Sequence, residues 1–431
     1  MATAGNSGRL LAQKIGFLIN PVHIVYFSGF LDLFGVSMIM PMILPYARDL
    51  GASPTVAGIL GSVYGGLQLF SSPVLGQWSD SVGRHFSLAL CLLVSGAGYM
   101  ALGVATSVTL LLLGRVPLGI FKHSQNFTKT YLADLVPENK RSAALGNFNA
   151  ASSMGFIIGP MVGGHVAELQ GGFRYVAFIA GAIFWINAAL VWFLLPEKGK
   201  PSQEKSGAGM ERDESSASLK KLASEEISFS PKNFLASLHA VDWPDLWDLF
   251  LIKFLAGFSV LLFRSNYTQV LRQKFDASPK TLGYMMSYSG LVAALCGLCV
   301  GKFTSLYSST AKVFFHMLIL QACTLFCLTV APSMTCVLIA TAPLSFVTAT
   351  QRVVATDLTL KRGGKQSRGG LMGLSQSVMS LARMLSPFLA GLAQEVHVDG
   401  PSTLAIFTTL VAVVLIYVRP QDPEKRKKKA E

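Results

Sequence analysis

Two stretches of this chain repeat each other. Residues 141–164 read RSAALGNFNAASSMGFIIGPMVGG, and residues 368–391 read RGGLMGLSQSVMSLARMLSPFLAG. At a constant offset the identical pairs are Arg141 with Arg368, Gly146 with Gly373, Ser153 with Ser380, Pro160 with Pro387, and Gly164 with Gly391. Both copies are apolar, rich in small residues and long enough to cross a bilayer. The chain is therefore expected to be a duplicated half, built from two related bundles of membrane helices.

The composition indicates a membrane protein and argues against a nucleic-acid-binding one. Of the 431 residues, 51% are hydrophobic and only 14% are charged, whereas a soluble globular protein carries about a quarter charged residues. The net charge of +13 arises from Lys and Arg beside the ends of apolar spans and from the basic run 425–429. These positions indicate a topology signal and attraction to anionic lipid rather than a nucleic-acid partner.

Apolar windows long enough for a membrane helix occur twelve times. The first six cover about 22–46, 55–75, 86–106, 109–131, 142–166 and 174–195, and the second six cover about 247–268, 281–301, 311–331, 333–354, 367–391 and 401–418. We predict an all-α membrane protein with twelve transmembrane helices in two six-helix bundles related by the internal repeat. The predicted parts are an N-terminal segment (1–21), the first bundle (22–196), a polar linker (197–245), the second bundle (246–418) and a basic tail (419–431).

The basic loop residues predict how the chain is oriented, because cytoplasmic loops carry an excess of Lys and Arg. Placing both termini in the cytoplasm puts the linker lysines, the basic tail and most basic loop residues inside. These loop residues are Arg84, Lys140, Arg141, Lys302, Lys312, Lys361, Arg362, Lys365 and Arg368, which leaves Arg48, Arg174, Arg272, Lys274 and Lys280 outside. Both termini are therefore expected to be cytoplasmic.

Four short motifs follow one another in the first half of the chain. They read LDLFGVSMIMPMILP (31–45), GQWSDSVGRH (76–85), GRVPLG (114–119) and GFIIGPMVGG (155–164). The second resembles the G-x-L-x-D-x-x-G-R-[RK] signature of the major facilitator superfamily, and the fourth resembles the antiporter motif of its drug–proton antiporter branch. Trp78 and His85 depart from the signature, and the equivalent loop of the second half, 301–310, lacks the acid and the Gly-Arg pair.

The loop after the second span is predicted to act as a conformational latch. Gly76 and Gly83 would permit a tight turn with close helix approach. Asp80 would pair with Arg84 and face the N-terminal end of the eleventh span when the halves close on the cytoplasmic side. In the alternative interpretation, Asp80 only orients the turn.

A stripe of small residues in the fifth span is predicted to pack against a neighbouring helix. Gly155, Gly159 and Gly163 recur every four residues, Gly164 follows them, and Pro160 removes a backbone hydrogen bond. The resemblance implies, in addition, that this stripe closes rigidly against proton leak.

Asp32 stands near the middle of the first span. A carboxylate there costs about 3 kcal/mol even on lenient insertion scales, so it is expected to face a cavity and to bind a proton or a cationic partner. We predict that Asp32 couples transport to protons or cations and contributes to the substrate site. A purely structural ion pair is the alternative.

Basic residues within the spans are the other candidates for the site. Arg115 is predicted to share one helix face with Lys122 and to take part in ion coupling and substrate binding. Arg383 lies near the middle of the eleventh span, where its repeat partner is the apolar Phe156. It either binds an anionic group of the substrate or pairs with backbone carbonyls. Lys253 and Arg264 are expected to extend to a membrane face instead.

These features predict a secondary transporter of a small organic solute that works by alternating access. The resemblance implies proton-coupled antiport. Two alternatives stay open, an uncoupled or organic-anion facilitator and a transporter-like sensor or scaffold. Since no nucleotide-binding, nucleophile or metal motif occurs, we expect no enzyme activity, cofactor or metal. The expected partners are the substrate, protons and membrane lipid, and the expected oligomeric state is a monomer.

Overall fold

The computed structural model describes residues 20–137, 140–196, 243–363, 368–419 and 421. Most of the predicted N-terminal segment, linker and tail lies outside these residues. The described part contains helices and no β-strand. The predicted all-α class is therefore confirmed.

The helices of the first half cover the six predicted spans, two of which are divided into a pair of helices. They are α2 (Pro21–Ile39), α3 (Ile43–Asp49), α4 (Pro54–Val82), α5 (Arg84–Val104), α6 (Val108–Phe121), α7 (Ser124–Leu135), α8 (Arg141–Ala167) and α9 (Gly172–Leu194). The helices of the second half are α12 (Trp243–Phe275), α13 (Pro279–Thr304), α14 (Thr310–Thr329), α15 (Met334–Arg362), α16 (Arg368–Val396) and α17 (Gly400–Val418).

Eight of the described helical segments are long and apolar enough to cross a membrane by length and composition alone. The other four predicted spans correspond to α4, to the broken pair α6 and α7, and to α8 and α16. Helices α4, α8 and α16 are rich in small and polar residues, which lowers their hydropathy, whereas α6 and α7 are each too short to cross a membrane alone. The chain is an integral membrane protein with many spans.

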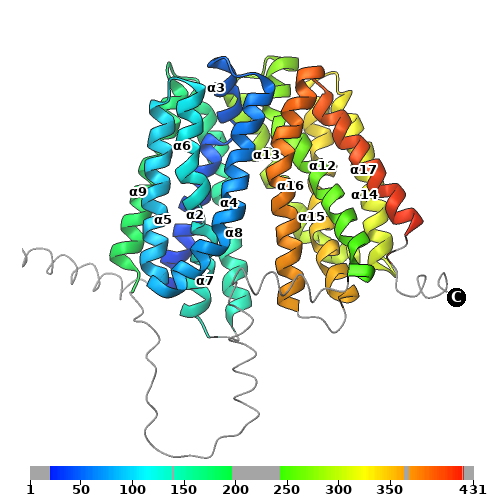
Figure 1. Ribbon diagram of the computed structural model, residues 1–431, viewed down its shortest axis with the longest axis horizontal. Helices are drawn as coiled ribbons and strands as arrows, with labels where there is room; N and C mark the ends of the chain where they lie inside the picture. Colours follow the sequence, from blue (N-terminus) through cyan, green and yellow to red (C-terminus); the bar gives the residue numbers. More distant parts are fainter. Residues whose placement is uncertain (1–19, 138–139, 197–242, 364–367, 420, 422–431) are drawn as a thin grey trace, which may run out of the picture.

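The two ends of the molecule are distinguished by the segments that lie there. At one end, at the top of Figure 1, lies the short helix α3 together with the loop that follows it, and we call this the α3 end. At the opposite end lie α7 and the two edges of the linker, and we call this the linker end. The long helices run between these two ends.

Each half buries an apolar core of its own. In the first half the largest fully buried side chains include Phe148, Phe184 and Leu92. In the second half the buried side chains include Phe258 and Phe314, which belong to separate clusters. Because the cores do not merge, one half can move relative to the other without exposing either core.

The two halves meet where α4 packs on α16 and α8 packs on α13. Glycines let the backbones touch, since a Cβ atom at Gly58 would lie 2.3 Å from the carbonyl oxygen of Pro387, and one at Gly283 would lie 2.2 Å from that of Pro160.

Polar contacts also join the halves, and they are concentrated at the α3 end. They are Arg272 with Asp49 (3.0 Å), the backbone N–H of Thr55 with Glu395 (3.2 Å), Ser278 with Glu168 (2.9 Å) and Tyr284 with His165 (3.1 Å). Figure 1 shows the ribbons of the two halves diverging toward the linker end. The structure is therefore a conformer in which the halves are joined at the α3 end.

The glycine stripe of α8 lies against α2. Cβ atoms at Gly155, Gly159 and Gly163 would lie 2.3 Å from the carbonyl oxygen of Phe30, 2.0 Å from Ser37 Oγ and 2.2 Å from the carbonyl oxygen of Met38, respectively. Gly164 instead faces α13, across the boundary between the halves. The first three positions therefore hold α2 and α8 together, and the fourth holds the two halves together.

Replacing Gly163 with alanine is expected to destabilise the first half by about 1–3 kcal/mol, because the new methyl group meets the backbone of α2, which cannot move aside. Gly146 provides a control on the same helix, since a Cβ atom there would meet nothing within 4 Å. Thermal unfolding of the purified protein should show a lower midpoint for Gly163→Ala and no loss for Gly146→Ala. Equal midpoints would contradict the close packing.

Candidate functional site

The fourth predicted span is not continuous, and its interruption lies beside Asp32. Helix α6 ends at Phe121 and α7 begins at Ser124, while Lys122 leaves helical geometry with a ψ angle of 60°. The prediction of one uninterrupted helix over 109–131 was therefore wrong. The break directs Lys122 and Ser124 toward α2.

Asp32, Lys122 and Ser124 form a buried polar triad. Lys122 Nζ lies 2.6 Å from Asp32 Oδ1, and Ser124 Oγ donates to the same oxygen at 2.6 Å. Lys122 also donates to Ser124 Oγ at 2.9 Å. The side chains of Lys122 and Asp32 are only 5% and 2% exposed. The triad is therefore an ion pair almost fully removed from solvent.

The second oxygen of Asp32 is different from the first. Asp32 Oδ2 is buried and has no hydrogen-bond partner. A buried carboxylate oxygen without a donor is costly, and a proton on it would lower that cost. Oδ2 is therefore the unsatisfied polar position of the triad.

Surrounding side chains hold the triad in position. The Lys122 ammonium group lies 4.7 Å from the centre of the Phe184 ring, which is a favourable cation–π distance. Gln125 donates to the carbonyl oxygen of Gly29 at 3.1 Å, and Asn187 donates to that of Ser28 at 3.0 Å. These bonds fix α2 between α7 and α9.

Arg115 does not join this triad. Its guanidinium carbon lies 5.1 Å from the centre of the Tyr64 ring, and its buried Nε has no hydrogen-bond partner. Arg115 and Lys122 were predicted to share one helix face. They contact different residues, because the chain changes direction at Lys122.

A second group of charges lies in the other half of the chain. Arg352 of α15 is close enough to both Arg264 of α12 and Arg383 of α16 to interact electrostatically with each. Arg383 interacts in addition with Tyr64, the residue on which Arg115 stacks. We call Arg115, Arg264, Arg352 and Arg383 the arginine cluster. It extends from the first half to the second.

The arginine cluster has few acids around it. In the described part of the chain, the charged neighbours of Arg264 and Arg383 are other arginines and tyrosines, not carboxylates. Arg264, Arg352 and Arg383 are exposed in the structure. Like charges repel at short range, so an anion placed among them would be stabilised.

One residue of this cluster, Arg352, was not named in the sequence analysis. Arg264, which was expected to extend to a membrane face, interacts electrostatically with it. Arg352 was not predicted as a site residue, because the predicted span ends at residue 354 and would place it at a membrane boundary. Helix α15 continues to Arg362, which leaves Arg352 well inside the helix.

The structure describes the backbone of the predicted latch and some of its side chains. Gly83 has a φ angle of 114° and separates α4 from α5, so only glycine fits there without strain. Gly76 lies inside α4, and in this conformer a Cβ atom there would meet nothing within 4 Å, so the close approach predicted at this residue stays a prediction. Arg84 pairs with Asp134 and donates to the carbonyl oxygen of Thr130 at 3.3 Å. The side chain of Asp80 lies outside the described residues.

The sequence matches the family model described as Major Facilitator Superfamily over residues 25–248 and again over 249–431. The chain belongs to the major facilitator superfamily. The two matches correspond to the two halves seen in the fold, and the predicted two-bundle fold is confirmed.

Individual members of the superfamily resemble the chain over most of its length. Multidrug resistance protein 2 of Bacillus subtilis is 27% identical over 403 residues, covering 92% of this chain and 94% of the relative. Quinolone resistance protein NorA of Staphylococcus aureus is 23% identical over 409 residues, covering 94% and 98%. The crystal structure of the human organic anion transporter MFSD10 (TETRAN) has a TM-score of 0.60 at 19% identity, covering 92% and 98%.

These comparisons confirm the predicted resemblance to the drug–proton antiporter-like branch of the superfamily. The protein is a secondary transporter of a small molecule and not an enzyme. Within that activity, the Asp32 triad and the arginine cluster are two charged groups of the described residues on which a transport mechanism can be built.

Proposed function

We propose that the protein transports small organic anions and couples their movement to protons. The observation that carries the proposed substrate class is the arginine cluster, in which Arg115 of the first half and Arg383 of the second both interact with Tyr64, with no carboxylate among the charged neighbours of Arg264 and Arg383 in the described part. Guanidinium groups bind carboxylates and phosphates through paired hydrogen bonds. A substrate with such a group would contact both halves at once.

The Asp32 triad argues against a cationic substrate. Lys122 already occupies the position that a substrate ammonium group would take beside Asp32, at 2.6 Å from Oδ1. A second cation would have to displace Lys122 and then leave it buried without a counter-charge, which is strongly unfavourable. An anionic substrate requires no such displacement.

We place proton coupling at Asp32. A proton on Asp32 removes the counter-charge of Lys122, and the ammonium group then interacts more weakly with α2. Because the triad joins α2 to the break between α6 and α7, its two charge states would favour different arrangements of these helices. We propose antiport as the form of coupling, because the chain resembles the drug–proton antiporter-like branch of the superfamily. Arg115, Lys122 and Arg383 are proposed to contact the substrate.

We further propose that the linker end faces the cytoplasm, because the start of α2, the end of α9, the start of α12 and the end of α17 lie there, together with most basic loop residues. The described conformer is then closed toward the outside. The glycine stripe of α8 and the loop around Gly83 and Arg84 are proposed to support closure, with Asp80 as part of the latch. We also propose that the chain is divided into the five parts with the boundaries predicted from the sequence. The protein is proposed to be a monomer in contact with membrane lipid.

Flux in proteoliposomes tests the proposal. Vesicles containing the purified protein would be loaded with a pH-sensitive dye and given either carboxyfluorescein or a cationic dye of similar size. We expect uptake of the anionic dye with an opposing movement of protons. Uptake of the cationic dye alone would overturn the substrate class. Anion uptake without any pH change would overturn proton coupling and favour an uncoupled facilitator.

A further inference from the structure

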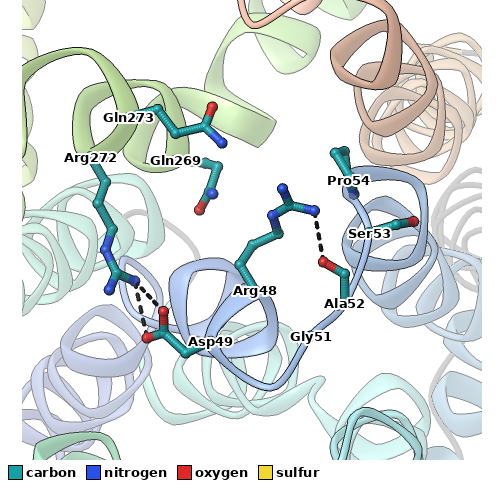
Figure 2. Close-up of a pocket in the computed structure, with 9 residues that line it drawn as sticks. All are labelled: Arg48, Asp49, Gly51, Ala52, Ser53, Pro54, Gln269, Arg272 and Gln273. Atoms are coloured by element: carbon teal, nitrogen blue, oxygen red, sulfur yellow. Dashed lines mark hydrogen bonds and ion pairs between the residues drawn. The ribbon is translucent and has the colours of Figure 1, made fainter.

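The α3 end contains a cavity that belongs neither to the Asp32 triad nor to the arginine cluster. Its volume is about 540 Å³. Residues 48–49 and 51–54, at the end of α3 and in the loop that follows it, form one wall, and Gln269, Arg272 and Gln273 of α12 form the other. Figure 2 shows these side chains around the cavity. The two halves of the transporter therefore each supply one wall.

Gln269 supplies an unsatisfied hydrogen-bond acceptor in this cavity. The residue is only 6% exposed, and its Oε1 has no hydrogen-bond partner. Buried amide oxygens are nearly always paired. A donor brought by a ligand would satisfy it.

Gln273 supplies a donor. Its Oε1 accepts a hydrogen bond from Gln394 at 3.1 Å, and Gln394 in turn accepts one from Asn266 at 2.7 Å. This chain of amides fixes which end of the Gln273 side chain is the oxygen. Its amino group is therefore directed toward the cavity, where Figure 2 shows it on the side that faces Arg48.

Arg48 supplies the positive charge. Its Nη1 donates to the carbonyl oxygen of Ala52 at 2.7 Å, and Figure 2 shows the remainder of the guanidinium group facing the space between α3 and α12. The neighbouring acids have hydrogen-bond or ion-pair partners of their own, and Glu395 also interacts electrostatically with Arg48. Asp49 pairs with Arg272 at 3.0 Å, and Glu395 accepts from the backbone N–H of Thr55 at 3.2 Å.

We propose that this cavity binds a small carboxylate that carries a hydroxyl or ammonium group on the adjacent carbon. The carboxylate would contact Arg48 and the amino group of Gln273, and the adjacent donor would contact Gln269 Oε1. Because both walls are present only while the halves are joined at the α3 end, the ligand stabilises this conformer. The site is therefore regulatory, and its lining residues belong neither to the Asp32 triad nor to the arginine cluster.

Calorimetric titration of the purified full-length protein tests the proposal, with glycolate as the probe and acetate as the analogue without the donor. We expect glycolate to bind more tightly than acetate. Arg48→Gln should lower the affinity for glycolate by about tenfold or more, since hydrogen bonds to a charged group are lost. Gln269→Leu should remove the preference for glycolate while leaving acetate binding unchanged. Arg174→Gln, at an exposed arginine of the same end outside the cavity, should bind as the unmodified protein does.

The same titrations separate this site from the arginine cluster. Arg383→Gln should leave glycolate binding intact, and Arg48→Lys should retain part of it, which shows that a folded protein is being measured. The proposal is overturned if glycolate does not bind, if acetate binds equally well, or if Arg383→Gln abolishes binding while Arg48→Gln does not. Its failure would leave the proposed transport of anions through the arginine cluster untouched.

Discussion

Replacing Asp32 with asparagine is expected to abolish uphill, proton-driven transport. Asparagine keeps the shape of the side chain and its hydrogen bond from Ser124, but it can no longer bind and release a proton. Counterflow exchange of substrate across the membrane does not require the proton and is expected to survive. Uptake into proteoliposomes with and without an imposed pH gradient measures the two activities.

The Asp32→Asn variant needs a control for folding, because Lys122 would remain buried without its counter-charge. Breaking a buried pair in this way costs about 3–5 kcal/mol. The double variant Asp32→Asn with Lys122→Gln removes both charges and is expected to recover stability while uphill transport stays absent. Uphill transport at the normal rate in either variant would show that Asp32 has only a structural role.

The general fold was predictable because hydropathy and repetition report it directly. A helix that crosses a bilayer must satisfy its own backbone and present apolar side chains, so the apolar windows coincide with the observed helices. Asp32 was predictable for the same reason. A carboxylate in such a window is costly enough to require a function or a partner.

The partner of Asp32 was not predictable from local patterns. Lys122 is 90 positions away in the chain, and a regular helix would have placed it on the same face as Arg115. The break between α6 and α7 separates the two. The sequence does carry a signal of that break, because the apolar run ends at Phe121 and the polar run KHSQN (122–126) follows it.

Arg352 was missed for a different physical reason. The apolar part of its span ends near residue 354, but α15 continues through polar residues to Arg362. Those polar residues have partners in the protein. Asp357, for example, accepts a hydrogen bond from Thr310 at 2.8 Å and pairs with Lys361 at 2.6 Å. Hydropathy reports apolar length and cannot report a helix that continues through polar residues paired with their own neighbours.

Replacing Arg352 or Arg383 with glutamine is expected to weaken the binding of an anionic substrate by about tenfold each, the effect of losing a charge-assisted hydrogen bond. Arg115→Gln should have an effect of similar size from the first half. Lysine at these positions should restore only part of the affinity, because it keeps the charge but loses the planar arrangement of donors. Titration of carboxyfluorescein binding to the purified variants measures the loss.

The pattern among these variants decides between substrate binding and helix packing. Arg383 also donates to the carbonyl oxygen of Met379 in its own helix at 3.3 Å, so a packing role predicts a lower unfolding temperature with unchanged affinity. A binding role predicts the reverse, together with a weaker preference for anionic over neutral dyes. Arg174→Gln removes an exposed arginine outside the cluster and should change neither quantity. If Arg352→Gln and Arg383→Gln both bind the anion as tightly as the unmodified protein, the arginine cluster is not the substrate site. The Asp32 triad is then the remaining candidate.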